Sequence, residues 1–224
     1  VNKKFSIALP AYGGTLKEGI IGNPRFINPL LAQTDADRDL VELTYAGLLR
    51  RDTEGNPVPA LAESYQISPD GLQYTVILKN NLRWSDGEKL TADDVVYTAH
   101  LINNPLLQSP LRAGWDKVEV EKIDDRTLQF RLPKAYVPFL ENLTVGILPQ
   151  HIWSNIPLSQ FSLVDINTDP VGAGPYRVNG LTHDSKGSIT AISLKDNSYF
   201  ALGRPHIQNI ELRFYQSESA IIQG

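Results

Sequence analysis

The sequence predicts a mixed α/β protein in which strands outnumber helices. Short segments of alternating apolar and polar residues, such as 73–79 (QYTVILK), are typical of strands with one buried face. Two longer segments, 35–46 and 91–103, instead carry apolar residues at helical spacing. Turn sequences such as Ser68-Pro69-Asp70-Gly71 separate these segments and divide the chain into short elements.

The first part of the chain predicts a strand followed by a helix. Residues 1–14 contain Pro and a Gly pair and predict an irregular lead-in, and 15–22 predict the first strand. The helix over 35–46 would be capped by Asp35 or Asp37, because a short polar side chain there can accept a backbone N–H.

The next part predicts turns and a second helix. Residues 50–59 are polar and predict a turn, and 60–65 predict a short helical turn. Thr91 and Asp94 form an imperfect capping box, because Glu or Gln is the usual residue at the third helical position. The helix that they open should run to about residue 103.

The second half of the chain predicts mainly strands. Two alternating segments flank Asp124-Asp125-Arg126 and predict a hairpin. The predicted strands of this half are 117–123, 127–132, 175–180, 188–195 and 207–215, with a short helix over 137–143 and a loop over 159–169.

Composition excludes several classes of function. The chain has 21 basic and 25 acidic residues, a net charge of −4, which argues against nucleic acid as a partner because phosphate binding needs a basic surface. It has no Cys, which excludes disulfides and thiolate metal sites. It also has no Met, so Val1 is not a natural start; removal of a signal peptide or lipid-anchored tether, or trimming of the chain, would each explain this.

No motif of catalysis, metal binding or phosphate binding stands out. There is no Gly-x-Ser-x-Gly, and the four His residues lack a zinc-ligand spacing. The carboxylate pairs Asp93-Asp94 and Asp124-Asp125 fall at a helix start and in a turn, where a structural role is expected. Gly172-Ala173-Gly174-Pro175 leads into a strand and predicts a turn. We therefore expect no enzyme activity, no metal and no cofactor.

Eight motifs in a fixed order carry a resemblance to a known family. They are INPL (27–30), GLL (47–49), PALAESY (59–65), DGLQYT (70–75), LRWSDG (82–87), LTADDVVY (90–97), GAGPYRV (172–178) and NSYF (197–200). Together they resemble the extracellular solute-binding proteins of the oligopeptide, dipeptide and nickel-binding family, from about residue 15 to the C-terminus.

The resemblance implies a periplasmic-binding-protein-like fold of type II. Residues 1–45 and 166–224 would form parts of its first lobe, and 46–165 would form the small domain that this family inserts. Family members are roughly twice as long and close two lobes on the ligand by a hinge motion. A C-terminal lobe that completes the pocket would therefore be absent from this chain.

The resemblance also implies a function. The chain would belong to the substrate-binding component of an ABC importer, a monomer that captures peptides or a similar small solute and delivers them to the permease subunits. It would be exported, periplasmic or anchored on the outer face of the cytoplasmic membrane. A ligand-sensing receptor and an exported hydrolase remain as alternatives.

The family pattern places the first candidate ligand segment after Asn28-Pro29. In this sequence it is Gln33, Thr34 and Asp35, which would pair with extended ligand backbone by strand addition. The alternative is that these residues only lead into the helix and cap it.

The resemblance places the other candidates in the inserted domain, which would contribute a loop over 109–115 after the helix that Thr91 caps. Arg112 would pair with a ligand carboxylate and Trp115 would stack on the ligand, unless Trp115 only anchors the following hairpin. Asn142 and Thr144 align with a stretch that reaches the cleft from below. Asn142 stands where some peptide binders carry His, so this position departs from the peptide-binding pattern.

Overall fold

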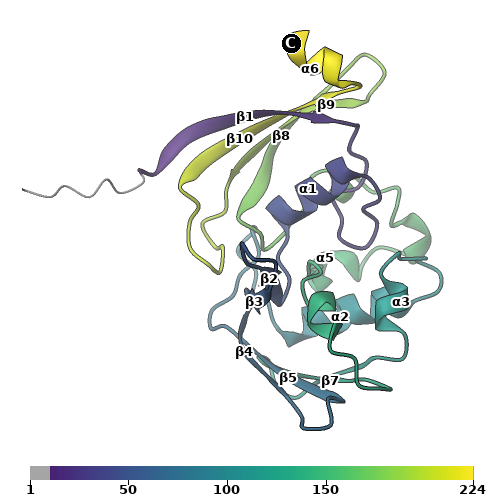
Figure 1. Ribbon diagram of the computed structural model, residues 1–224. Coiled ribbons are helices and arrows are strands. Elements are labelled where there is room, and N and C mark those ends of the chain that lie inside the picture. Colours follow the sequence, from purple (N-terminus) through teal and green to yellow (C-terminus); the bar gives the residue numbers. More distant parts are fainter. Residues whose placement is uncertain (1–10, 224) are drawn as a thin grey trace, which may run out of the picture.

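Two four-stranded sheets from different parts of the chain organise the structure (Figure 1). The structure is a computed structural model, and it describes the backbone of residues 11–223 and the side chains of residues 11–221. The first sheet has the order β1-β10-β9-β8; β1 runs parallel to β10, and the other pairs are antiparallel. Its strands are β1 (Gly13–Ile21), β8 (Tyr176–His183), β9 (Ile189–Asp196) and β10 (Ile207–Tyr215). These strands confirm the predicted first strand and the three predicted C-terminal strands, whereas residues 1–10 of the predicted lead-in lie outside the described residues.

The second sheet is wholly antiparallel and has the order β4-β5-β7-β6. A separate two-stranded pair, β2 with β3, precedes it and forms the predicted polar turn at 50–59. The strands are β2 (Leu49–Arg51), β3 (Pro57–Pro59), β4 (Ala62–Ile67), β5 (Gln73–Leu78), β6 (Glu119–Lys122) and β7 (Thr127–Arg131).

Short helices lie between and beside the sheets. Helix α1 lies against the first sheet and contacts β8 (Figure 1). Helix α2 packs on β6 of the second sheet and on α3 and α5. The helices are α1 (Asp35–Thr44), α2 (Ala92–Asn103), α3 (Arg112–Trp115), α4 (Phe139–Asn142), α5 (Gln150–Trp153) and α6 (Glu218–Gln223), with 3₁₀ turns η1 (Leu158–Gln160) and η2 (Asp165–Asn167). The predicted loops at 109–115 and 159–169 therefore each contain a helical turn.

The predicted helical turn at 60–65 is wrong, because β4 occupies most of this segment. Ser64 pairs with Ile77 and Ile67 pairs with Tyr74 across the β4–β5 ladder, with a register shift next to Ala62. Pairing with a neighbouring strand overrides a weak local preference for helix, because strand formation depends on what lies across the ladder.

The predicted start of α2 is confirmed. The Asp94 carboxylate accepts the Thr91 N–H at 2.8 Å, and the two residues complete the capping box despite the unusual Asp. The apolar stripe of α2 is buried as expected, with Val95, Ala99 and Ile102 at most 1% exposed.

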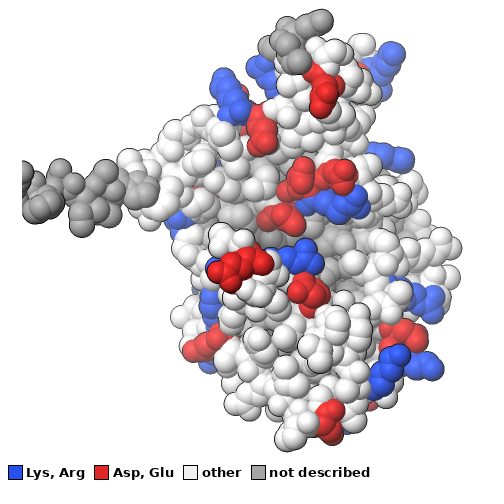
Figure 2. Space-filling view, viewed as in Figure 1, with Lys and Arg blue, Asp and Glu red and all other residues white. Residues whose placement is uncertain are grey.

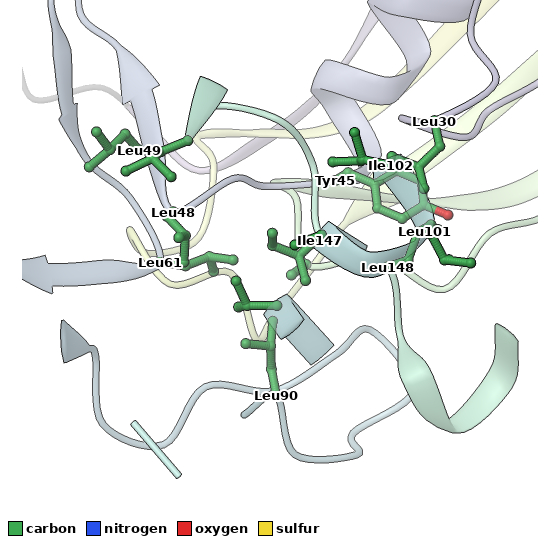
Figure 3. Packing of buried hydrophobic residues seen from close by; sticks show 14 of the residues in the cluster. Leu30, Tyr45, Leu48, Leu49, Leu61, Leu90, Leu101, Ile102, Ile147 and Leu148 are labelled. Carbon is green, nitrogen blue, oxygen red and sulfur yellow. The ribbon is translucent and has the colours of Figure 1, made fainter. Parts of the chain in front are cut away.

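One continuous core joins two parts of the molecule: the first part carries the first sheet and α1, and the second part carries the second sheet and α2 to α5. Leu30 and Tyr45 come from the first part, and Leu101, Ile102 and Leu148 from the second, and Figure 3 shows them gathered around the Tyr45 ring. The Tyr45 hydroxyl is buried and has no hydrogen-bond partner among the described residues. Burial raises the pKa of Tyr45 well above its usual value.

Candidate functional site

Thr34, not Asp35 or Asp37, is the N-cap of α1. The Thr34 hydroxyl accepts the Asp37 N–H at 3.1 Å, and the Asp37 carboxylate accepts the Thr34 N–H at 3.1 Å. The predicted caps, Asp35 and Asp37, lie one and three residues too late, because a Thr followed three residues later by Asp is also a capping box.

The Asp37 carboxylate organises the whole segment before α1. It accepts backbone N–H groups from Arg25 at 2.7 Å, Phe26 at 3.0 Å, Gln33 at 3.2 Å and Thr34 at 3.1 Å, and the residue is 1% exposed. Burial alone would raise the pKa of Asp37, but these four backbone donors outweigh it and hold the pKa below its usual value. Its sequence position predicts only a cap for α1, and the bonds to Arg25 and Phe26 depend on the tertiary structure.

The backbone of the first candidate segment is engaged within the protein. Asp37 takes the N–H groups of Gln33 and Thr34, and the Gln33 carbonyl accepts Arg38 Nη1 at 2.9 Å. Arg38 also pairs with Asp35 at 2.7 Å. Strand addition at Gln33 and Thr34 would require these bonds to break, whereas the side chains of Gln33 and Asp35 are exposed.

The second candidate segment, 109–115, ends in α3. Its two expected ligand residues, Arg112 and Trp115, differ in exposure. Arg112 is exposed, and no carboxylate of the described residues pairs with it. Trp115 is 3% exposed, and its ring packs edge-to-face against Phe130 and Phe139 with centroids 6.2 and 5.6 Å apart. The Trp115 ring therefore has the packing role that the sequence left open as the alternative, and it offers no face for stacking on a ligand.

Asn142 and Thr144 also make contacts within the protein. Asn142 Nδ2 donates to the Gly114 carbonyl at 2.6 Å and so ties α4 to α3. The Thr144 hydroxyl donates to the Glu141 carbonyl at 2.8 Å. The Arg112 segment and Asn142 are thus joined, whereas no hydrogen bond or ion pair of the described residues links Gln33, Thr34 or Asp35 to them.

Thr144 lines a cavity of about 310 Å³ where the two parts of the molecule meet. Arg50, Arg51 and Glu42 supply charge, and Arg51 is paired with Glu141 at 2.9 Å. The other residues that line the cavity are mostly apolar and come from both parts of the molecule: Tyr45, Ala46, Gly47, Leu49, Ala60, Pro175, Phe200 and Leu202.

Three segments of the chain, 44–47, 144–146 and 172–174, come very close together beside this cavity, and we call this region the junction. Four glycines make the close approach possible. A Cβ on Gly172 would lie 1.9 Å from the Thr44 carbonyl oxygen, and one on Gly47 would lie 2.5 Å from the Thr144 backbone. Gly146 and Gly174 are equally crowded, with contacts of 2.7 and 2.5 Å. The predicted turn at Gly172–Pro175 is in fact a close approach of backbones, which only glycine permits.

An acid/base pair exists but lacks a nucleophile. His151 Nε2 lies 2.9 Å from Asp86 Oδ2, and within the part of the chain that the structure describes no Ser or Thr hydroxyl bonds to this ring. Burial raises the pKa of nearby Asp94, but its oxygens accept backbone N–H groups from Thr91 and Gln150 and so hold α2 to α5. The hydrogen bonds of Asp94 therefore give it a structural role.

The described residues contain no metal-ligand cluster, and the face in Figure 2 carries no patch of one charge. Acidic and basic side chains are interspersed over the face in Figure 2, which carries no extended area of one sign. Residues 11–221 contain no cluster of three or more His, Asp or Glu suited to a metal ion. Among residues 11–223, no helix combines the length and the apolar character that a membrane span requires.

Comparison with known proteins identifies the family of this chain. A family model for bacterial extracellular solute-binding proteins, family 5 (Middle), matches residues 56–223. The oligopeptide-binding protein AppA of Bacillus subtilis is 30% identical over 223 residues, which cover 98% of this chain and 40% of AppA. The chain therefore spans less than half the length of this relative.

Solved structures share the fold. The structure of B. subtilis AppA in complex with a nonapeptide has a TM-score of 0.86 and 28% identity, covering 95% of this chain and 42% of AppA. The ABC transporter substrate-binding protein CtaP of Listeria monocytogenes has a TM-score of 0.82 and 33% identity, covering 94% of this chain and 42% of CtaP. The periplasmic-binding-protein-like fold expected from the sequence is thus confirmed, and the chain belongs to the bacterial extracellular solute-binding proteins of family 5.

Proposed function

We propose that this chain is part of the substrate-binding component of an ABC importer, which captures peptides or a similar small solute and performs no chemistry on it. Membership of family 5 over residues 56–223 is the observation that carries the proposal. The proteins it resembles are named for oligopeptide binding and for ABC transport.

The chain supplies one wall of the ligand cleft in this proposal. Residues 1–45 and 166–224 form parts of the first lobe, and 46–165 form the inserted small domain. Sheet membership supports this division, because the first sheet uses only strands from 13–21 and 176–215 and the second uses strands from 62–131. A further lobe, outside this chain, completes the pocket.

The ligand contacts that we propose come from side chains. Gln33 and Asp35 project from a backbone that Asp37 holds in place. Arg112 is exposed and pairs with no carboxylate of the described residues, so it is suited to a ligand carboxylate. Thr34 caps α1, and Asn142 positions α3 through Gly114, so both act through their neighbours. Thr144 contributes to the junction cavity. A peptide, with a carboxylate and polar backbone, fits these groups best.

The protein that contains this chain would act outside the cytoplasmic membrane, periplasmic or anchored by lipid, as a monomer that docks on permease subunits. Membership of an extracellular family supports this location.

The decisive experiment is mass spectrometry of the ligand that co-purifies with the longer protein. A peptide population bound at one per protein is the expected result. Turnover of a peptide or glycoside library would contradict the proposal and favour the exported hydrolase. Ligand binding without association with permease subunits in membranes would favour a sensing receptor.

The isolated 224-residue chain gives a second test. We expect it to bind peptides weakly or not at all, because most of the surface that buries a ligand would come from the absent lobe. Peptide binding at about 1 μM or tighter, measured by calorimetry, would contradict this expectation.

A further inference from the structure

A second cavity, here called the α3 cavity, lies beside α3, and none of the residues that line it is among the proposed peptide contacts. Its volume is about 480 Å³, within the range of small-molecule sites. Its floor is apolar and consists of Val118, Leu132 and Phe139, each at most 9% exposed. Tyr136 stands at its edge with 45% of its surface exposed. The cavity therefore offers a place for an apolar or aromatic group beside an exposed ring.

Two lysines supply positive charge to the α3 cavity. Lys117 and Lys134 both line it, and neither forms an ion pair with the residues that the structure describes. Asp116 lines it too and is likewise without an ion-pair partner, so one positive charge remains in excess. A small anion would therefore be attracted to the cavity, since unlike charges at short range attract even near water.

The backbone of Lys117 adds an independent observation. Val118 N–H donates to the Trp115 carbonyl at 3.0 Å and closes a tight turn. Asp116 has φ −57° and ψ 123°, and Lys117 has φ +57°, which is a type II turn. Glycine is the favoured residue at this third position, because a side chain there is strained. Lys117 therefore stands at a strained position, and strain of this kind is found more often at functional sites than elsewhere.

Hydrogen bonds fix both walls of the α3 cavity. Asn142 Nδ2 holds the Gly114 carbonyl at 2.6 Å, and the Tyr74 hydroxyl donates to the Tyr136 carbonyl at 3.3 Å. The cavity is therefore formed before a ligand arrives, which lowers the cost of binding.

We propose that the α3 cavity binds a small aromatic carboxylate, with the carboxylate between the ammonium groups of Lys117 and Lys134 and the ring on the floor beside Tyr136. This site goes beyond the proposed function: it lies within the inserted domain and needs no second lobe.

A nitrogen-15 NMR titration of the 224-residue chain with 4-phenylbutyrate tests the proposal. We expect saturable shifts of the Gly114, Lys117 and Val118 amides with a Kd of about 1 mM. The neutral analogue 4-phenylbutan-1-ol should bind about fivefold more weakly, because it lacks the charge that the lysines attract.

Three variants separate ligand binding from folding. Lys134→Gln should weaken binding about fivefold, and Lys186→Gln, which changes an exposed lysine in the β8–β9 turn, should leave it unchanged. Lys117→Gly should weaken binding by a similar factor while raising the Tm by about 1–3 °C, because glycine relieves the strained turn. A purely structural role for Lys117 could not produce weaker ligand binding together with a higher Tm.

Three outcomes would overturn the proposal. They are the absence of saturable shifts up to about 20 mM ligand, equal binding of the acid and the alcohol, and wild-type affinity in both Lys117→Gly and Lys134→Gln.

Discussion

The junction and the α3 cavity differ in what they allow a side chain to do. At the junction, glycines bring backbones so close that a single added carbon would clash. Around α3, Arg112, Lys117 and Lys134 are exposed and free of ion pairs among the described residues. The junction thus specifies how the two parts are joined, and the α3 region is available for recognition. Substitutions in the first should change stability, and substitutions in the second should mainly change binding, with only a small change in stability where Lys117 strains its turn.

The largest effect is expected at the junction. Gly172→Ala would place a Cβ 1.9 Å from the Thr44 carbonyl oxygen, and this backbone cannot move without opening the junction. We expect a loss of about 3–5 kcal/mol in the free energy of unfolding, measured by urea denaturation. Gly180→Ala is the matched control, because its Cβ meets only the Ser193 side chain and should cost less than about 1 kcal/mol. Equal stabilities of the two variants would show that the junction can relax.

Asp37→Asn should have the next largest effect. The amide offers one oxygen in place of two, so buried N–H groups of the 25–34 segment lose their partner, and we expect a loss of about 2–3 kcal/mol at pH 7. Asp39→Asn, an exposed change in the same helix, should cost less than about 0.5 kcal/mol.

The effect of Asp37 should depend on pH with a defined sign. Its pKa is lowered in the folded protein, so its stabilising contribution is complete above the unfolded value near 3.9 and is lost as the pH falls through the folded value. The difference between wild type and Asp37→Asn should therefore be full at pH 7 and shrink below about pH 4. A difference that grows on acidification would contradict the assigned hydrogen bonds.

Tyr45→Phe should stabilise the protein. The buried Tyr45 hydroxyl has no partner among the described residues, so its removal should raise the free energy of unfolding by about 1 kcal/mol. Tyr74→Phe is the contrasting control, since that hydroxyl donates to the Tyr136 carbonyl, and its loss should cost about 1 kcal/mol. Destabilisation by Tyr45→Phe would reveal a partner for this hydroxyl, such as a buried water.

The smallest change in stability is expected for Arg112→Ala. Its exposed side chain should contribute within about 0.5 kcal/mol to the free energy of unfolding. In the longer protein it should weaken peptide binding about tenfold, as measured by calorimetry, if it pairs with a ligand carboxylate. Arg213→Ala, on an exposed site of β10, should change neither quantity. Unchanged affinity in Arg112→Ala would remove this residue from the proposed site.

Local patterns predicted most of the fold. The alternation of 73–79, the capping box of Thr91 and Asp94 and the strand at 207–215 each depend on nearby residues, and each is confirmed. The strand β4 was missed because its partner strand decides its conformation. The Gly172 approach to Thr44 was also missed, because its partner lies more than a hundred residues away in sequence.

The candidate site was predicted less well, for a related reason. Family motifs locate segments, but they do not show which atoms of a segment are already engaged. Gln33 and Thr34 have their backbone groups taken by Asp37, and Trp115 is enclosed by Phe130 and Phe139. Exposure and hydrogen bonding depend on the tertiary structure, so only the structure separates Arg112 from Trp115.

The parallel pairing of β1 with β10 constrains the order in which this chain can fold. Gly13 pairs with Ile207, so β1 must wait for a partner strand that is synthesised about 190 residues later. At ribosomal speeds of about 5–20 residues per second this delay is about 10–40 s. The antiparallel β8–β9–β10 ribbon is local and can form by itself, and β1 then joins its free edge. In the first sheet, β1 is therefore synthesised before its three partners and joins after them.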